Sequence, residues 1–231
     1  MASGRGSGGY FGKLPARGDF VTAACPAGFL KLWEPFLLEG LAQSRLDLKT
    51  AWEEAYMTMP VWRFWMKPAN GDKLEGAVAG AFMPSVDRVG RKFPLTVVAP
   101  VSPGESETAR PAGDWYETVE AILLQTLQED ADLAGFQKAV ADLVPPVAAS
   151  DDNPSAGLPE LAAMEETGEW VSSGFYCRAG DSEFAFSCSG LPHPHAFRWF
   201  ILPEAFGGAV TDEHQGAGSS GGLYHPEDSR T

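Results

Sequence analysis

The sequence predicts an α+β fold in which a mostly antiparallel sheet is combined with helices. Residues 61–67, 77–83 and 95–101 are short apolar runs, and the connections between them contain Gly, Pro and Asn. Before and after these runs, apolar residues recur at the three- and four-residue spacing of amphipathic helices. Because the three predicted strands follow one another with no helix between them, we expect an antiparallel meander and not a β-α-β series.

The N-terminal part begins with a Gly- and Ser-rich stretch, residues 1–8, that we expect to be disordered. Residues 10–15 are typical of a short strand that ends at a proline. A helical period begins at Pro26, and we expect a kink or a restart at Pro35, because proline lacks an amide donor and crowds the preceding turn. A second helix is predicted over residues 48–57.

The first strand of the meander, residues 61–67, has the clearest alternation in the chain. Its pattern places Trp62, Phe64 and Met66 on one face of the sheet. The strand leads into residues 68–72, where an Asn-Gly pair supplies the positive φ that a tight turn needs.

Two helices are predicted after the meander. Asp114 and Glu117 have the spacing of a capping box, which would begin the first of these helices. The second helix ends before the Pro-Pro pair at residues 145–146. Its inward-facing residues are predicted to be Leu133, Phe136, Val140 and Leu143.

The last part of the chain contains a linker, a hairpin and a tail. Residues 145–169 hold four prolines, so we expect a surface crossover there. Strands are predicted over residues 173–178 and 183–188. Residues 197–202 are apolar almost throughout and fit either a strand or a helix. Residues 207–231 are Gly/Ser-rich and acidic, and we expect them to be disordered.

The charge distribution narrows the classes of partner. The 231 residues carry a net charge of −14, with twelve Lys or Arg against nine Asp or Glu in residues 1–100 and two against fifteen in residues 101–170. A nucleic acid is not an expected partner, because phosphate contacts need a basic surface. No apolar run is long enough for a membrane span or a signal-peptide core, so we expect a cytoplasmic protein that is not inserted into a membrane. The more basic first part indicates an acidic protein partner or a small anion.

Neither a metal centre nor a disulfide framework is predicted. The chain has three cysteines, an odd number. Cys25 lies far from the other two, and Cys177 and Cys188 are eleven residues apart, so we expect reduced, buried thiols. His193 and His195 lie near Cys188, but the other two histidines are in the tail, and a metal site needs three or four ligands that converge.

We also expect no cofactor and no catalytic activity. No phosphate-binding Gly-rich loop follows a predicted strand. A Gly-x-Ser-x-Gly match at residues 218–222 lies in the tail, outside the strand–turn–helix context that a nucleophile elbow requires.

The connection at residues 84–94 is the most informative stretch, because it places four charges in six residues between two apolar strands. Two interpretations are open. Asp87 can pair internally with Arg88 or Arg91 and hold the loop in shape. Alternatively, Arg88 and Arg91 can form a guanidinium surface for an acidic or phosphorylated partner, since guanidinium groups bind such anions in a bidentate geometry. The two interpretations are compatible.

Three motifs carry a resemblance to a known family. They are Tyr-Phe-Gly-Lys-Leu-Pro-Ala-Arg-Gly-Asp-Phe at residues 10–20, Pro-Val-Trp-Arg-Phe at 60–64 and Pro-Ser-Val-Asp-Arg-Val-Gly-Arg-Lys-Phe-Pro-Leu at 84–95. In this order they closely resemble the TagF/ImpM family, which is associated with bacterial type VI secretion systems. The resemblance implies a single α/β domain over residues 9–206, with a mostly antiparallel central sheet flanked by helices, similar to a longin or roadblock-like sandwich.

The resemblance also implies a function. It indicates a cytosolic accessory protein that restrains assembly or activation of the secretion system after translation, in some systems by binding a forkhead-associated-domain scaffold protein. Some family members are fused to a phosphatase domain, for which this chain has no room.

The sequence is therefore compatible with two functions of different class. The preferred one is a non-enzymatic regulatory binding module. Its expected partner-binding residues are Lys13, Arg17, Asp19, Asp87, Arg88, Arg91 and Lys92. The alternative is an enzyme or sensor that binds a small anionic ligand through Arg17, Arg88 and Arg91.

Overall fold

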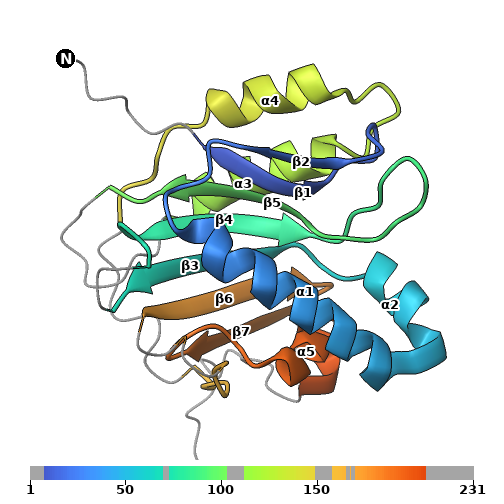
Figure 1. The fold of residues 1–231 in the computed structure, drawn as a ribbon, viewed down its shortest axis with the longest axis vertical. Coiled ribbons are helices and arrows are strands. Elements are labelled where there is room, and N and C mark those ends of the chain that lie inside the picture. Colours follow the sequence, from blue (N-terminus) through green and yellow to red (C-terminus); the bar gives the residue numbers. More distant parts are fainter. Residues whose placement is uncertain are drawn as a thin grey trace, which may run out of the picture.

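Seven strands form one sheet through the middle of the molecule, with helices on both of its faces (Figure 1). The computed structural model describes residues 8–69, 73–102, 112–148, 158–164, 167 and 170–206. The strands are β1 (Gly9–Lys13), β2 (Phe20–Ala23), β3 (Trp62–Pro68), β4 (Val78–Met83), β5 (Leu95–Pro100), β6 (Val171–Ala179) and β7 (Ser182–Cys188). Every pairing between neighbouring strands is antiparallel.

The strand order β2-β1-β5-β4-β3-β6-β7 places the predicted meander, β3 to β5, at the centre of the sheet. The N-terminal hairpin joins the meander through β1 and β5, with Tyr10 opposite Val97. The C-terminal hairpin joins it through β6 and β3, with Phe175 opposite Phe64. Both hairpins are thus held by contacts between segments that lie far apart in the sequence.

The helices are α1 (Phe29–Leu48), α2 (Trp52–Met57), α3 (Gly113–Gln125), α4 (Leu133–Ala141) and α5 (Phe197–Ile201). Short 3-10 turns lie at Lys49–Ala51, Pro194–Ala196 and Pro203–Phe206. Figure 1 shows α1, α2 and α5 on the near side of the sheet and α3 on the far side. The predicted fold class, a single α+β domain with a central antiparallel sheet flanked by helices, is confirmed. No helix within the described ranges is both long enough and apolar enough to cross a lipid bilayer.

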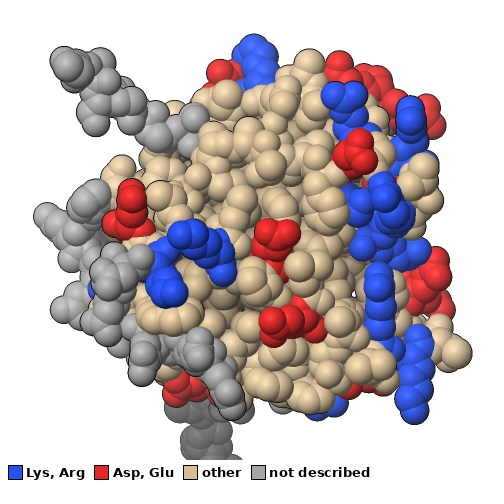
Figure 2. All heavy atoms as spheres, viewed as in Figure 1, with Lys and Arg blue, Asp and Glu red and all other residues tan. Residues whose placement is uncertain are grey.

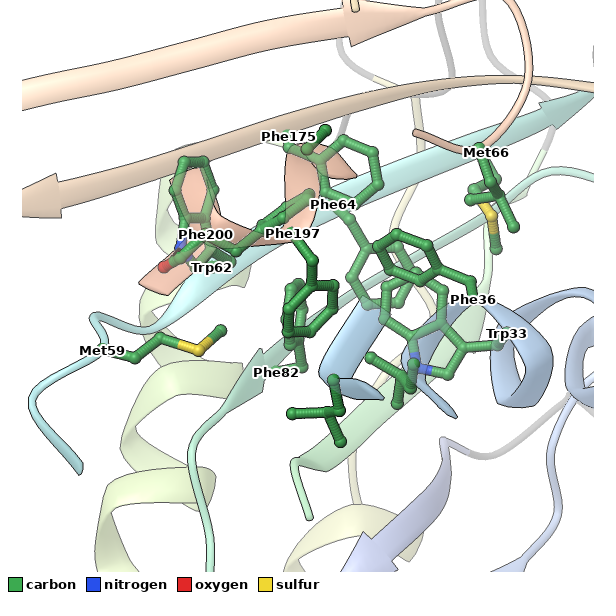
Figure 3. Packing of buried hydrophobic residues seen from close by; sticks show 14 of the residues in the cluster. Trp33, Phe36, Met59, Trp62, Phe64, Met66, Phe82, Phe175, Phe197 and Phe200 are labelled. Carbon is green, nitrogen blue, oxygen red and sulfur yellow. Dashed lines mark hydrogen bonds between the residues drawn. The ribbon is translucent and has the colours of Figure 1, made fainter. Parts of the chain in front are cut away.

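The larger core lies between α1, α5 and one face of the sheet, and it is built from aromatic rings (Figure 3). Trp33 of α1 stacks on Phe64 of β3 with ring centroids 4.3 Å apart, and its indole N–H donates to the Thr96 hydroxyl at 2.9 Å. Gly40 of α1 lets this helix pack closely against α5, because a Cβ at residue 40 would lie 2.2 Å from the ring of Phe197 in α5. As predicted, Trp62, Phe64 and Met66 all face this core.

A smaller core lies on the opposite face, under α3 and α4. It is made of aliphatic side chains from β5 and the two helices, with Tyr10 packed edge-on against Phe136 at 5.1 Å. Phe136, Val140 and Leu143 are buried here, as the helical period predicts, and Leu133 is half-buried. The sheet is therefore the middle layer of three.

Three local predictions are corrected or resolved. Helix α1 begins at Phe29 and continues through Pro35 without a restart, because packing of the neighbouring aromatic residues compensates for the missing amide hydrogen bond. Helix α3 begins one residue before Asp114, with Ala112 at its N-cap, so the capping box is wrong. Asp114 occupies the first turn, where the helix dipole also favours a carboxylate. The ambiguous residues 197–202 contain the helix α5.

The remaining predictions lie partly outside the described residues. Residues 1–7, the Asn-Gly turn at 70–72 and the tail from residue 207 all fall there. In the linker, Leu161 is buried and its amide donates to the Ser187 carbonyl at 2.8 Å, so the described part of that linker packs on β7.

Candidate partner-binding site

The first and third sequence motifs meet at one end of the sheet. The loop between β4 and β5 projects from the sheet beside the turn between β1 and β2 (Figure 1). The Arg88 amide donates to the Arg17 carbonyl at 2.9 Å, and the Ser85 hydroxyl donates to the Lys13 carbonyl at 2.8 Å. We call these two adjoining segments, residues 14–19 and 84–94, the double loop.

The β4–β5 part of the double loop is a closed turn and not an open excursion. Val86 and Lys92 form an antiparallel bridge at its base. Above the bridge, the Asp87 amide donates to the Arg91 carbonyl at 3.0 Å and the Gly90 amide to the Asp87 carbonyl at 2.9 Å. Gly90 has φ of 84°, which glycine adopts without steric cost. The backbone of this turn is therefore well determined by its own hydrogen bonds.

The Asp87 carboxylate holds the turn together from inside. Its Oδ1 accepts the backbone amides of Val89 at 3.0 Å and Arg91 at 2.8 Å. Its Oδ2 accepts the ammonium of Lys13 at 2.5 Å and the Nε of Arg91 at 2.6 Å. Because the side chain of Asp87 is 0% exposed and that of Lys13 only 6%, this ion pair joins β1 to the turn in the interior.

These hydrogen bonds set the ionisation of Asp87. Burial alone would raise its pKa, but the hydrogen bonds from Lys13 and Arg91 and from the amide of Val89 outweigh burial and hold the pKa well below its ordinary value. Asp87 is consequently a carboxylate at neutral pH, as the contact with the Lys13 ammonium requires.

Helix α2 supports the double loop from the other side. The buried Tyr56 hydroxyl donates to the Ser85 carbonyl and accepts the Ser85 amide, both at 3.0 Å. Lys92 pairs with Glu53 at 2.6 Å, and the Lys92 hydrogen bond lowers the pKa of that glutamate. The role of Tyr56 was missed at the sequence level, because nothing local marks a tyrosine as a partner for a backbone 29 residues away.

The close approach of two backbone segments explains why the first motif has a glycine at position 12. Gly12 has φ of 137°, and a Cβ at this position would lie 2.0 Å from the Pro94 carbonyl oxygen. Only a residue without a side chain lets β1 approach the end of the β4–β5 loop this closely. The Phe-Gly-Lys motif and the Arg-Lys-Phe-Pro motif are thus complementary parts of one contact.

Two arginines remain available at the surface. Arg17 and Arg88 are exposed, and neither side chain has an ion-pair or hydrogen-bond partner among the described residues. They line a groove of about 550 Å³ together with Asp19, Phe20 and Gln137. Figure 2 shows Lys and Arg side chains gathered along the right-hand edge of the molecule, the end where the double loop and α2 lie.

The seven predicted site residues therefore fall into two groups. Lys13 and Asp87 are buried, and Arg91 and Lys92 are engaged with acidic partners, although the Arg91 side chain is still 58% exposed. Arg17, Asp19 and Arg88 are exposed, and their side chains have no ion-pair or hydrogen-bond partner within the described part of the chain. Of the two internal pairings considered for Asp87, the one with Arg91 forms, together with a further pair to Lys13.

The histidines and cysteines singled out in the sequence lie as follows in the described ranges. No three His, Cys, Asp or Glu side chains there converge as a metal site would require. The three cysteines are free, and burial raises the pKa of Cys25 to about 11 and that of Cys188 to about 12. Such thiols are poor nucleophiles at neutral pH. His193 and His195 stack on each other at 5.2 Å in the turn before α5.

The chain has recognisable relatives. Residues 9–143 match the family model described as the TagF N-terminal domain, type VI secretion system-associated. The chain is also similar to PA0076 from Pseudomonas aeruginosa PAO1, known from a crystal structure at 2.05 Å resolution. The two are 32% identical over 94% of this chain and 100% of that chain, with a TM-score of 0.65. No curated protein matches the chain. The family match includes both segments of the double loop, and the chain therefore belongs to the TagF family associated with type VI secretion.

Proposed function

We propose that this protein is a cytoplasmic, non-enzymatic binding module that restrains assembly or activation of a type VI secretion system after translation. In this proposal it acts by binding a component of the system, such as a forkhead-associated-domain scaffold protein, through the exposed side of the double loop. The association with type VI secretion comes from the family. The restraining role and the partner are the proposal.

The observation that carries the proposal is that some charged residues at the double loop are paired inside it and others are exposed at its surface. Asp87, with Lys13 and Arg91, holds the backbone rigid from inside. The same turn presents Arg88, beside Arg17, and no described residue forms a hydrogen bond or an ion pair with either side chain. Because the backbone that carries Arg88 is already ordered, binding restricts mainly the two arginine side chains, and guanidinium groups suit carboxylates in a bidentate geometry.

The contrast with the rest of the molecule supports a protein partner with an acidic face. The chain as a whole has a net charge of −14, so an acidic partner is repelled by most of the chain and attracted only by its basic parts. Electrostatic complementarity of this kind orients the two proteins before contact.

The test is a pull-down from the native bacterium with the tagged wild type and the Arg17→Ala/Arg88→Ala variant. A matched control, Lys31→Ala/Arg178→Ala, also removes two exposed positive charges, from α1 and β6. We expect the wild type and the control to capture secretion-system components and the double-loop variant to lose them while keeping its melting temperature. Retention of every such component by the folded double-loop variant would show that the contact surface lies elsewhere.

A second candidate, a sensor or enzyme for a small anion, is supported by the groove itself. Its volume of about 550 Å³ is that of a small-molecule site, and it is lined by Arg17 and Arg88. Arg91, the third arginine of this candidate, donates to Asp87 and to the Gly18 carbonyl. Calorimetric titration with inorganic phosphate and with citrate discriminates between the two: saturable binding that is lost in Arg17→Ala/Arg88→Ala favours the sensor, and no heat of binding favours the protein-binding module.

A further inference from the structure

The two edge strands of the sheet, β7 and β2, differ in the backbone pairing of their outer sides. At one edge, β7 is bridged on its outer side at Ser187: Leu161 donates to the Ser187 carbonyl at 2.8 Å and Ser187 donates to the Pro159 carbonyl at 3.0 Å. At the other edge, no described residue pairs with the outer side of β2. Within the described part of the chain, the backbone amides and carbonyls of β2 that point away from β1 are therefore left for a further strand.

β2 is a short edge strand whose own residues carry neither a charge nor a proline. Its four residues are Phe20-Val21-Thr22-Ala23, and three of the four are exposed. Charged residues and prolines are what normally keep an edge from pairing with another chain. Phe20 is 48% exposed although its ring packs against both Phe11 and Phe93, at 5.8 and 4.8 Å between ring centroids. This ring is a fixed apolar surface at the start of the open edge.

The groove lies along this same edge. It is lined by residues 16–22, which include three of the four β2 residues, and its far wall is formed by Leu133 and Gln137 of α4. Figure 1 shows β2 at the end of the sheet beside α4. The two walls differ in charge, because Arg17, Asp19 and Arg88, with a net charge of +1, lie at the end where β2 begins and the two α4 residues of the lining are uncharged.

We propose that the groove receives an extended, acidic peptide segment of the partner protein, which adds to β2 as an eighth strand. Backbone hydrogen bonds to β2 supply affinity, as in other cases where a peptide extends a sheet. Carboxylates of the segment pair with Arg17 and Arg88, and its uncharged residues lie along Leu133 and Gln137. The inference rests on the proposed function, since it names how the partner is held at the same surface.

Charge complementarity is the reason to choose an acidic segment over a second copy of this chain. A second β2 would bring four uncharged residues to the edge, with one flanking carboxylate, Asp19, for two arginines, and two copies that each carry a net charge of −14 repel each other. An acidic strand satisfies the edge and the guanidinium groups together. The four residues of β2 span roughly 13 Å, so a segment of ordinary strand length covers the edge and reaches the arginines.

The test uses a capped synthetic peptide, Glu-Glu-Val-Thr-Val-Thr-Glu-Glu, with amide hydrogen exchange of the full chain followed by NMR. We expect saturable binding and slowed exchange of those β2 amides that are unprotected in the free protein. Binding should weaken about tenfold in Arg17→Ala/Arg88→Ala and in high salt. A peptide with Lys in place of Glu, and one with proline at both Val positions, should bind far more weakly.

Several results would overturn the inference. Absence of binding, equal binding of the Lys peptide, or binding that leaves the β2 amides exchanging as before would each do so. A dimer in sedimentation that protects β2 without peptide would show that a second copy is the occupant instead. The pull-down tests the proposed function separately. If the arginine variant loses its partners but the peptide does not protect the β2 amides, only the strand addition is refuted. If the arginine variant keeps its partners, the double loop is not the contact surface.

Discussion

Lys13 and Asp87 are 74 residues apart in the sequence, and their charged groups are 2.5 Å apart in the interior, between the first strand and the β4–β5 loop. Both side chains are almost fully excluded from water. This contact joins two of the three family motifs and orders the turn from which Arg88 projects. The surface that we propose for partner binding therefore depends on an ion pair that is buried beneath it.

Replacement of Asp87 by Asn should destabilise the protein and loosen the loop. The change keeps the size of the side chain but leaves the Lys13 ammonium without its counter-charge in the interior, which is costly. We expect a clear fall in the melting temperature by calorimetry. Asp19→Asn, at an exposed aspartate, is the matched control and should leave the melting temperature unchanged. Equal melting temperatures for Asp87→Asn and the wild type would refute the interior role of the pair.

Stability should also depend on pH through Asp87. The pKa of this carboxyl is depressed in the folded state, so the unfolded chain binds the proton more readily. Its contribution is complete above the unfolded carboxyl pKa of about 3.9 and is lost as the pH falls further toward the folded pKa. Urea unfolding at a series of acid pH values should therefore show a shallower loss of stability below about pH 4 in Asp87→Asn than in the wild type. Parallel profiles would contradict this assignment.

Arg88 and Arg91 should respond differently to truncation, although they are three residues apart and both exposed. Arg91→Ala removes hydrogen bonds to Asp87 and to the Gly18 carbonyl, and we expect a loss of about 1 kcal/mol. Arg88→Ala removes no side-chain hydrogen bond or ion pair to a described residue and should change stability by less than about 0.5 kcal/mol. Chemical denaturation measures both. The reverse order would place Arg88, and not Arg91, in the structural role.

Tyr56→Phe should lower the free energy of unfolding by about 2 kcal/mol, because the Ser85 amide then loses its acceptor in a buried position. Tyr10→Phe is a useful comparison. The Tyr10 hydroxyl accepts from the exposed Gln137 amide, which water can satisfy, so the expected loss is smaller. If the two variants unfold at the same urea concentration, the Tyr56 contact contributes nothing specific to the loop.

Gly12→Ala should cost about 2 kcal/mol or more, since the new Cβ would meet the Pro94 carbonyl and the backbone has a positive φ. Gly18→Ala provides the control in the same motif, because nothing lies within 4 Å of a Cβ there. Its effect should stay within about 0.5 kcal/mol. A tolerated Gly12→Ala would mean that β1 and the β4–β5 loop can separate without loss.

Features that depend on local pattern could be predicted from the sequence. The alternation of Trp62, Phe64 and Met66 locates β3 because one face of that strand is buried and the other is not. The class of fold follows from the succession of such strands without helices between them. The family match rests on motif residues whose packing, at Gly12 for example, has a physical reason in the structure.

Features that depend on distant contacts could not be predicted. Local charge suggested Arg88 or Arg91 as the partner of Asp87, and the structure adds Lys13 from another strand. Residues 197–202 bury one face, made of Phe197, Phe200 and Ile201, but the less buried face is also largely apolar, so hydrophobicity alone carries no period that separates helix from strand. The open edge of β2 follows from the order of strands in the sheet, which strand-by-strand patterns do not contain.

The most direct measurement of the central claim is a calorimetric titration of a purified type VI forkhead-associated-domain scaffold protein into the wild type, Arg17→Ala/Arg88→Ala and the charge-matched Lys31→Ala/Arg178→Ala. The account predicts saturable binding to the wild type and the charge-matched control, and at least about tenfold weaker binding, or about 1.4 kcal/mol, to the double-loop variant. Equal affinity of all three proteins, or no binding to the wild type, would contradict it.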